Sequence, residues 1–239
     1  MMEVNTLLIG IILFLAAFTQ SLAGFGVALI SMALLPELMG IRMATPLVAI
    51  VSLVVDVAVL LRYREALDLH KIWRVVLAAL VGTPVGVYFL SSVDEHLAMI
   101  ILGIILAGYA LYALLGLRLP RLEHPLWSYI AGLWGGMLGG AYNTSGPPVI
   151  VYADCRAWPR ETFKSNLQGY FLVSSLATLA SHALNGNLKS SVWDTFWWTL
   201  PFIVAGLLAG FGLDRWVKPE FFRRIVLILL VVMGIRLML

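Results

Sequence analysis

The sequence contains few charged residues. Asp, Glu, Lys and Arg make up 12% of its 239 residues, whereas about 25% is usual in soluble domains. Hydrophobic residues make up 61%. This shortage of charge excludes an ordinary soluble domain and indicates an integral membrane protein. Cysteine is also scarce, because Cys155 is the only one. An internal disulfide is therefore excluded, a cysteine-based metal site is disfavoured, and we expect Cys155 to be a packing thiol.

Several familiar motifs are missing as well. No Lys or Arg precedes the first apolar run, so we expect no cleavable signal peptide. Neither HExxH nor Gly-x-Ser-x-Gly is present, and Ser145 has no obvious histidine base because His182 is expected near the outer surface. We predict that the protein is not an enzyme, with an intramembrane enzyme as a remote alternative, and that it has no cofactor or metal. The basic residues cluster at the ends of apolar segments, which favours topology signals over nucleic-acid binding.

Long apolar runs fill most of the chain. They are continuous, whereas the strands of a membrane barrel alternate between apolar and polar residues. As helices they are long enough to cross a hydrocarbon core of about 30 Å. The sequence therefore predicts an all-α polytopic membrane protein. We place the apolar segments at residues 4–36, 43–61, 72–90, 97–117, 126–153, 163–184, 192–213 and 221–239.

A weak internal repeat relates the first part of the chain to the second. The tryptophan pair carries most weight, because leucine and glycine matches arise easily by chance in apolar sequence. We expect two membrane repeats, residues 1–117 and 118–239. The matched residues, each 120 positions apart, are Gly26 and Gly146, Ile30 and Ile150, Leu47 and Leu167, Trp73 and Trp193, Leu80 and Leu200, Gly86 and Gly206, and Asp94 and Asp214.

The basic residues distinguish two arrangements of these halves. If all eight segments cross the membrane, the 16 Lys and Arg residues divide equally between the two sides, without the usual cytoplasmic excess. If 4–36 and 126–153 are re-entrant hairpins, only Arg42, Lys189 and Arg236 lie outside. This bias favours two inverted repeats, each a re-entrant helical hairpin plus three transmembrane helices, with both termini on the outer side. Eight full spans are the alternative.

Helix breakers and hydroxyl residues interrupt both long segments. A single helix over 4–36 would be about 50 Å long, so we expect it to fold at QSLAGFG (20–26), and its repeat mate to fold at GGAYNTSGPP (139–148). Non-helical backbone at membrane depth is tolerated only where protein buries it or where it lines a wet cavity. Two such tips from inverted halves would meet near the midplane, the usual place of a transporter site.

The second arm of each hairpin would point its N-terminus at this centre. Free N–H groups and about half a positive charge at each N-terminus suit a small oxyanion, and Pro147 suits a first helical turn. A site without buried Lys or Arg can also release the anion. The predicted substrate-binding residues are Gln20, Ser21, Gly24, Phe25, Gly26, Asn143, Thr144, Ser145, Gly146, Pro147, Gln168 and Tyr170.

Further polar residues within apolar segments each have two interpretations. Asn166, Gln168 and Tyr170 either complete the site or form helix–helix hydrogen bonds. Asp56 is either a proton carrier that couples transport or an interfacial, structurally paired residue about 8 Å of helix rise from Arg62. We favour the second interpretation of Asp56.

Residues near segment ends are more easily explained by the membrane boundary. We expect His182, Trp73 and Trp193 to belong to the aromatic belt. Arg42 and Lys164, at the starts of paired segments on opposite sides, either attract anions into the two mouths or anchor loops.

The two tips also resemble those of a known family, the sulfite exporter TauE/SafE family of membrane anion transporters. The resemblance rests on GFGVALI (24–30) and on the glycine-rich run ending in SGPP (145–148), and the eight short-looped segments extend it over nearly the whole chain. The family pattern carries over to Gly24, Phe25, Gly26, Gly139, Gly140, Gly146, Pro147 and Pro148. Residues 141–145 (AYNTS) depart from it, since relatives often carry more glycine there, so the substrate stays open within the class.

The resemblance implies transport of small sulfur-containing anions. We predict a secondary transporter that moves a small sulfur oxyanion, of the sulfite, thiosulfate or organosulfonate type, across the cytoplasmic membrane and is coupled to protons. Its partners are this small anionic substrate and the lipid bilayer. A passive anion channel of the same fold is the alternative, and the direction of transport and the oligomeric state stay open.

Overall fold

The chain is described by a computed structural model that covers residues 2–116, 120–213 and 219–239. Within these residues it is all-helical, as predicted, and contains no strand. Three basic residues from the charge count, Arg118, Arg215 and Lys218, and the boundary between the predicted halves lie outside the described residues. The helices are α1 (Met2–Ala23), α2 (Val27–Met39), α3 (Ile41–Tyr63), a 3-10 turn η1 (Arg64–Ala66), α4 (Leu69–Ser92), α5 (Glu95–Leu115), α6 (Leu126–Tyr142), α7 (Gly146–Cys155), α8 (Arg160–Leu184), α9 (Ser190–Leu213) and α10 (Pro219–Leu237).

Helices α1, α3, α4, α5 and α9 are long and apolar enough to cross a membrane, which confirms a polytopic membrane protein. Helix α8 has 25 residues but is less apolar, because it carries buried polar residues such as Asn166, Gln168 and Ser174. Helix α1 reaches the length of a full crossing between Thr6 and Ala23. The first arm is therefore longer than the half-helix that we expected.

Both predicted breaks in the long apolar segments are present. Helices α1 and α2 are separated at Gly24 and Gly26, whose φ angles are 82° and 132°, a region that residues with a Cβ rarely adopt. Helix α6 ends at Asn143, which has a left-handed φ of 56° and is, after glycine, the residue most often found in that conformation. Neither long segment forms a single unbroken helix.

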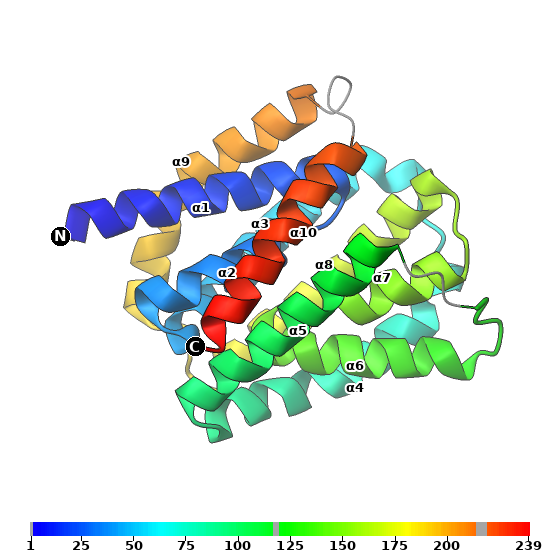
Figure 1. Cartoon of the computed structure of the whole chain (residues 1–239), viewed down its shortest axis with the longest axis horizontal. Helices are drawn as coiled ribbons and strands as arrows, with labels where there is room; N and C mark the ends of the chain where they lie inside the picture. The colour runs from blue at the N-terminus through cyan, green and yellow to red at the C-terminus, as the bar shows by residue number, and fades with distance from the viewer. Residues whose placement is uncertain (1, 117–119, 214–218) are drawn as a thin grey trace.

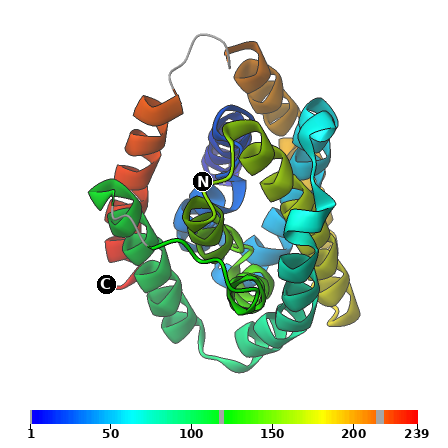
Figure 2. The same ribbon diagram turned by 90° about the vertical axis from the view of Figure 1, so that its right-hand side faces the viewer.

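The two broken segments approach each other from opposite ends of the molecule. Helix α1 runs from left to right and α2 returns, whereas α6 runs from right to left and α7 returns (Figure 1). Seen from the right-hand end, α5 (green) and α10 (red) lie on one flank and α4 (teal) and α9 (orange) on the other (Figure 2). Helices α3 and α8 pack against each other. The breaks are therefore enclosed by helices of both halves.

Glycine permits the broken segments to pack closely on the outer helices. Helix α1 packs along α9, and α6 packs along α4. A Cβ at Gly206 of α9 would overlap the carbonyl oxygen of Phe14, and a Cβ at Gly86 of α4 would overlap that of Met137. Small residues that let backbones touch are typical of helix association in membranes. Gly86 and Gly206 are also a predicted repeat pair, so corresponding helices make corresponding contacts.

Candidate functional site

A buried cavity lies between the two breaks, near the middle of α3 and α8. It contains about 360 Å³ of empty space, part of it open to solvent. Both tips contribute to its wall, as we predicted for a shared site. The lining residues are Gln20, Phe25, Gly26, Val27, Ala28, Leu29, Ser52, Asp56, Asn143, Thr144, Ser145, Gly146, Ile150, Phe171 and Ser175.

Helix α2 begins at this cavity. The N–H of Val27 donates to Gln20 Oε1 at 3.0 Å, so a side chain from α1 caps the first turn. Within the described part of the chain, the N–H groups of Ala28 and Leu29 have no recorded acceptor. First-turn N–H groups point out of the N-terminal end of a helix. The start of α2 therefore offers backbone donors and a partial positive charge to the cavity.

Helix α7 begins on the opposite wall. Asn143 is held in its left-handed turn by Nδ2, which donates to the carbonyl oxygen of Thr45 on α3 at 2.7 Å. Ser145 and Gly146 follow at the helix start, and for their N–H groups too no acceptor is recorded among the described residues. Two helix N-termini therefore meet at one cavity, as expected for an oxyanion site.

Asp56 is buried in the wall of the same cavity. Its side chain is held by two neutral donors, Gln20 Nε2 on Oδ1 at 2.7 Å and Ser175 Oγ on Oδ2 at 2.7 Å. Asp56 is thus structurally paired, as we favoured, but it is 1% exposed and its partners are Gln20 and Ser175, whereas Arg62 donates to the carbonyl oxygen of Phe211. The sequence argument used only the distance along α3, and that distance does not indicate that α1 and α8 enclose Asp56.

Ser52 adds a hydroxyl that sequence analysis did not single out. It lies one turn before Asp56 on α3, is 6% exposed and lines the cavity. Its Oγ has no hydrogen-bond partner among the described residues. A buried hydroxyl without a partner is costly, and an occupant of the cavity would supply one. Phe171 and Ser175 on α8 were also missed.

Several predicted residues lie close to the tips without lining the cavity. Gln168 holds the break between α1 and α2 from outside the cavity, because its Nε2 donates to the carbonyl oxygen of Gly24. Ser21 Oγ donates to carbonyl oxygens of its own helix. Tyr170 is fully buried, with its hydroxyl beside Gly135. Pro147 lines a separate apolar cavity.

The remaining candidates hold loops and helix ends. Asn166 does not complete the site, because its Oδ1 accepts from the N–H of Asp68 at 2.8 Å. Lys164 Nζ donates to the carbonyl oxygen of Leu22 at 3.2 Å. Arg42 donates to the carbonyl oxygen of Val93 at 3.3 Å.

The expected belt residues differ in burial. His182 is 1% exposed and its ring contacts the Asn187 amide at 3.0 Å, so its assignment to the aromatic belt is wrong. Trp73 and Trp193 are 44% and 37% exposed, as the belt requires.

The cavity wall presents neutral donors and one carboxyl group. Among the described residues that line it, none is Lys, Arg or His, and Asp56 is the one ionisable side chain. Across the described residues, no group of three His, Cys, Asp or Glu side chains is placed to hold a metal ion. The neutral groups in the wall that can contact an occupant are backbone N–H groups, the amides of Gln20 and Asn143, the hydroxyl of Thr144 and three serines.

Comparisons with known proteins identify the family of the chain. The family model described as "Sulfite exporter TauE/SafE" matches residues 9–237. The chain is also 29% identical over 230 residues to the "Probable sulfite/organosulfonate exporter TauE" of Cupriavidus necator. The matched region covers 93% of this chain and 89% of the relative. No solved structure matches the chain. Since the family model covers nearly the whole sequence, the protein belongs to the sulfite exporter TauE/SafE family, which is a family of membrane transporters and not of enzymes.

Proposed function

We propose that the protein is a secondary transporter that carries a small sulfur-containing oxyanion through the cavity between the two tips. The observation that carries this proposal is the meeting of two helix N-termini at one buried cavity lined by neutral donors. The sulfur chemistry is inferred from the relative of Cupriavidus necator, whose name refers to sulfite and organosulfonates. The substrate-binding residues would be Gln20, Phe25, Gly26, Ser52 and the loop 143–146.

Neutral donors suit a transporter better than a fixed cation would. Charge-assisted contacts to Lys or Arg are about twice as strong as neutral ones, and a transported anion must leave as well as bind. Backbone N–H groups at a helix start bind an oxyanion with the helix dipole and need no side-chain ordering. Ser52 and Ser145 add adjustable hydroxyls. The departure from the glycine-rich family pattern at 141–145 falls on this wall, so we infer that these residues select the substrate.

We also propose two inverted halves, residues 1–117 and 118–239, each with a re-entrant hairpin and three transmembrane helices. The opposed directions of the hairpins (Figure 1) and the matching contacts of Gly86 and Gly206 support this arrangement. The positive-inside count then puts both termini outside the cytoplasmic membrane. This arrangement is tested with two variants, Arg42→Cys and Arg156→Cys, each made in a Cys155→Ser background and labelled with a thiol reagent from one side of the membrane at a time. Inverted hairpins require labelling from opposite sides, whereas eight full spans require the same side.

Proton coupling at Asp56 is part of the proposal. An anion and the Asp56 carboxylate would share one cavity that no cationic side chain lines, so binding is favoured when Asp56 carries a proton. The Ser175 hydroxyl can donate to the carboxylate or accept from the carboxylic acid, while Gln20 donates in both states. Protonation therefore requires no rearrangement of the network.

The charged groups on neighbouring elements are engaged elsewhere and do not neutralise Asp56. Lys164 of α8 contacts the Leu22 carbonyl, and Glu37 of α2 pairs with Arg236 at 2.9 Å. A proton is therefore the available counter-charge, and anion and proton would move together.

Ser52→Ala tests the binding site with little structural disturbance. Because Ser52 Oγ has no partner among the described residues, its removal breaks no protein hydrogen bond but removes one contact to the anion. We expect sulfite, thiosulfate and methanesulfonate to raise the melting temperature of the purified protein, and Ser52→Ala to weaken that binding about fivefold to tenfold. Ser145→Ala and Gln20→Ala should weaken it as well.

Ser31→Ala is the matched control. Ser31 is also a buried serine with an unpartnered hydroxyl among the described residues, but it lies on α2 outside the cavity lining. Its variant should bind as the wild type does. Equal affinity of Ser52→Ala and wild type, or no stabilisation by any small anion, would sink the proposed site.

A further inference from the structure

A second, apolar cavity opens on the outer side of α5, α6 and α7. It contains about 940 Å³ of empty space, part of it open to the surroundings. Its walls include Tyr112 of α5, Trp127, Ile130 and Trp134 of α6, and Val151 of α7. We call this cavity the α5–α7 groove. It differs from the cavity between the two breaks: Gly146 of α7 lines that cavity, whereas Pro147 lines the α5–α7 groove.

The groove has the length of one leaflet of a bilayer. Along α6 it extends from Trp127 to Leu138, a rise of about 16 Å. The hydrocarbon core of a bilayer is about 30 Å thick, so the groove reaches from the membrane boundary to near the midplane. Its aromatic end, with Trp127, lies where tryptophan is enriched in membrane proteins. An acyl chain is the occupant that fits an apolar channel of this depth.

Basic residues surround the end of the groove that contains Trp127. Tyr152 lines the groove and also a polar cavity that contains Arg74 and Arg156. Arg156 Nη1 donates to the carbonyl oxygen of Leu122 at 3.2 Å, and Leu122 is another groove residue. The apolar groove and the basic cavity are therefore neighbours on either side of Tyr152.

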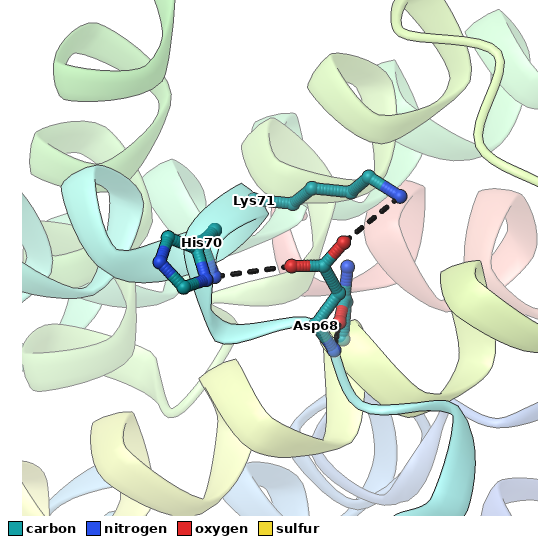
Figure 3. A network of polar contacts seen from close by, with 4 residues as sticks. Asp68, His70 and Lys71 are labelled. Carbon is teal, nitrogen blue, oxygen red and sulfur yellow. Dashed lines mark hydrogen bonds and ion pairs between the residues drawn. The ribbon is translucent and has the colours of Figure 1, made fainter.

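Two arginines line this basic cavity, and one of them, Arg156, donates from Nη1 to the carbonyl oxygens of Leu122 and Glu123. Lys71 is paired with Asp68 at 3.0 Å, and Asp68 also accepts from the His70 N–H (Figure 3). By contrast, neither Arg74 nor Arg156 forms an ion pair with a described residue. Arginine binds phosphate oxygens in a fork geometry, so the uncompensated charge suits a phosphate group.

We propose that the α5–α7 groove and the adjoining basic cavity bind an anionic phospholipid. One acyl chain lies in the groove, and the phosphate contacts Arg74 and Arg156. Basic pockets between transmembrane helices on the cytoplasmic side are recognised sites for anionic headgroups. By the topology inferred above, the lipid belongs to the cytoplasmic leaflet. The proposal needs the membrane placement of the protein but not its transport activity.

Lipid selectivity of the purified full chain tests the proposal. We would measure binding of phosphatidylglycerol and phosphatidylcholine with matched chains by native mass spectrometry and by quenching of tryptophan fluorescence with brominated lipids. Each uncompensated basic residue near a headgroup is worth about fivefold in affinity. Two arginines predict a preference of about 25-fold for phosphatidylglycerol, falling to about fivefold in Arg74→Gln. Lys189→Gln removes a charge in the α8–α9 loop and should change nothing.

A second variant separates the acyl chain from the headgroup. Val151→Trp fills the groove and leaves every charge in place, so phosphatidylglycerol binding should be lost. Should this variant fail to fold, quenching of the wild type by brominated phosphatidylglycerol decides. The site is supported if brominated phosphatidylglycerol quenches the tryptophan fluorescence much more than brominated phosphatidylcholine does, and if Trp127→Phe reduces this quenching.

Three results would overturn it. Equal binding of the two lipids would show that the headgroup is not contacted. If inorganic phosphate competes with the lipid, and phosphate still binds to Val151→Trp, the site is one for small anions only. Protection of Trp127 and Trp134 by a second copy of the chain, with a dimer in light scattering, assigns the groove to self-association. Anion transport is unaffected by any of these results, so failure here is distinguishable from failure of the proposed function.

Discussion

Asp56→Asn should abolish the pH dependence of anion binding while leaving the cavity intact. Asparagine keeps an oxygen that accepts from Gln20 Nε2, and its amide can donate to Ser175 Oγ, so both hydrogen bonds of the wild type persist. The substitution mimics a permanently protonated Asp56. We expect the variant to bind the anion at all pH values as tightly as the wild type does at low pH.

The size of the effect follows from the cavity. If the anion lies at the starts of α2 and α7, in the cavity that Asp56 also lines, two unit charges on the order of 7 Å apart would repel by about 2.4 kcal/mol at an effective dielectric constant of about 20. Loss of the Asp56 proton as pH rises should therefore weaken wild-type binding by roughly fiftyfold. The sign is fixed, since only the deprotonated form repels the anion.

Methanesulfonate suits this measurement because it keeps one charge over the accessible pH range. Titration calorimetry from pH 5 to 9 should show weakening affinity for the wild type and a flat profile for Asp56→Asn. In proteoliposomes the variant should exchange anions but no longer accumulate them against a gradient. A pH profile for Asp56→Asn that parallels the wild type would refute the assignment of Asp56 as the coupling group.

Five further substitutions, at Gly140, Gly108, Asn143 and Asp68, test the stability of the fold. Gly140→Ala places a Cβ against a carbonyl of α4 and should lower stability by about 1–3 kcal/mol or more, whereas Gly108→Ala, which meets open space, should be neutral or stabilising in thermal unfolding. Asn143→Gly should lower the free energy of unfolding by about 1 kcal/mol, because only the side-chain hydrogen bond is lost. Asn143→Ala should lower it by roughly 1–2 kcal/mol more, because alanine is strained in the left-handed conformation. Equal losses in the two variants would contradict the role of the turn. A hydrogen bond from Lys71 holds the pKa of Asp68 below its ordinary value, so its contribution is complete above about pH 4 and disappears as pH falls through the lowered pKa. Asp68→Asn should therefore lower the melting temperature at pH 7, and by a smaller amount as pH falls through the lowered pKa.

The helices and their breaks could be read from the sequence. Continuous apolar runs give helix positions to within a few residues, and Gly24, Gly26 and Pro147 are residues whose backbone limits alone predict a change of direction. The hydroxyl-rich loop at 143–145 indicated a polar site because such residues are costly in lipid. These signals are local, so one chain is enough to detect them.

The contacts across the site could not be read in this way. Asp56 and Gln20 are 36 positions apart, and nothing in either segment states that they meet. Polar residues in apolar helices show that a partner is needed but not which one, so Asn166 and Gln168 looked like site residues although they hold backbone. Ser52 and Ser175, on the paired segments 43–61 and 163–184, carried a usable signal, as small polar residues near the middle of apolar helices.

Transport in proteoliposomes tests the central claim most directly. Vesicles containing the purified protein would be given labelled sulfite, thiosulfate or methanesulfonate, with and without a pH gradient. We predict that at least one anion accumulates when the outside is more acidic, that Ser52→Ala reduces its uptake, and that Ser31→Ala does not. Uptake of every anion at the rate of protein-free vesicles would contradict transport through this cavity, and uptake that ignores the pH gradient would leave a passive anion channel in place of a coupled transporter.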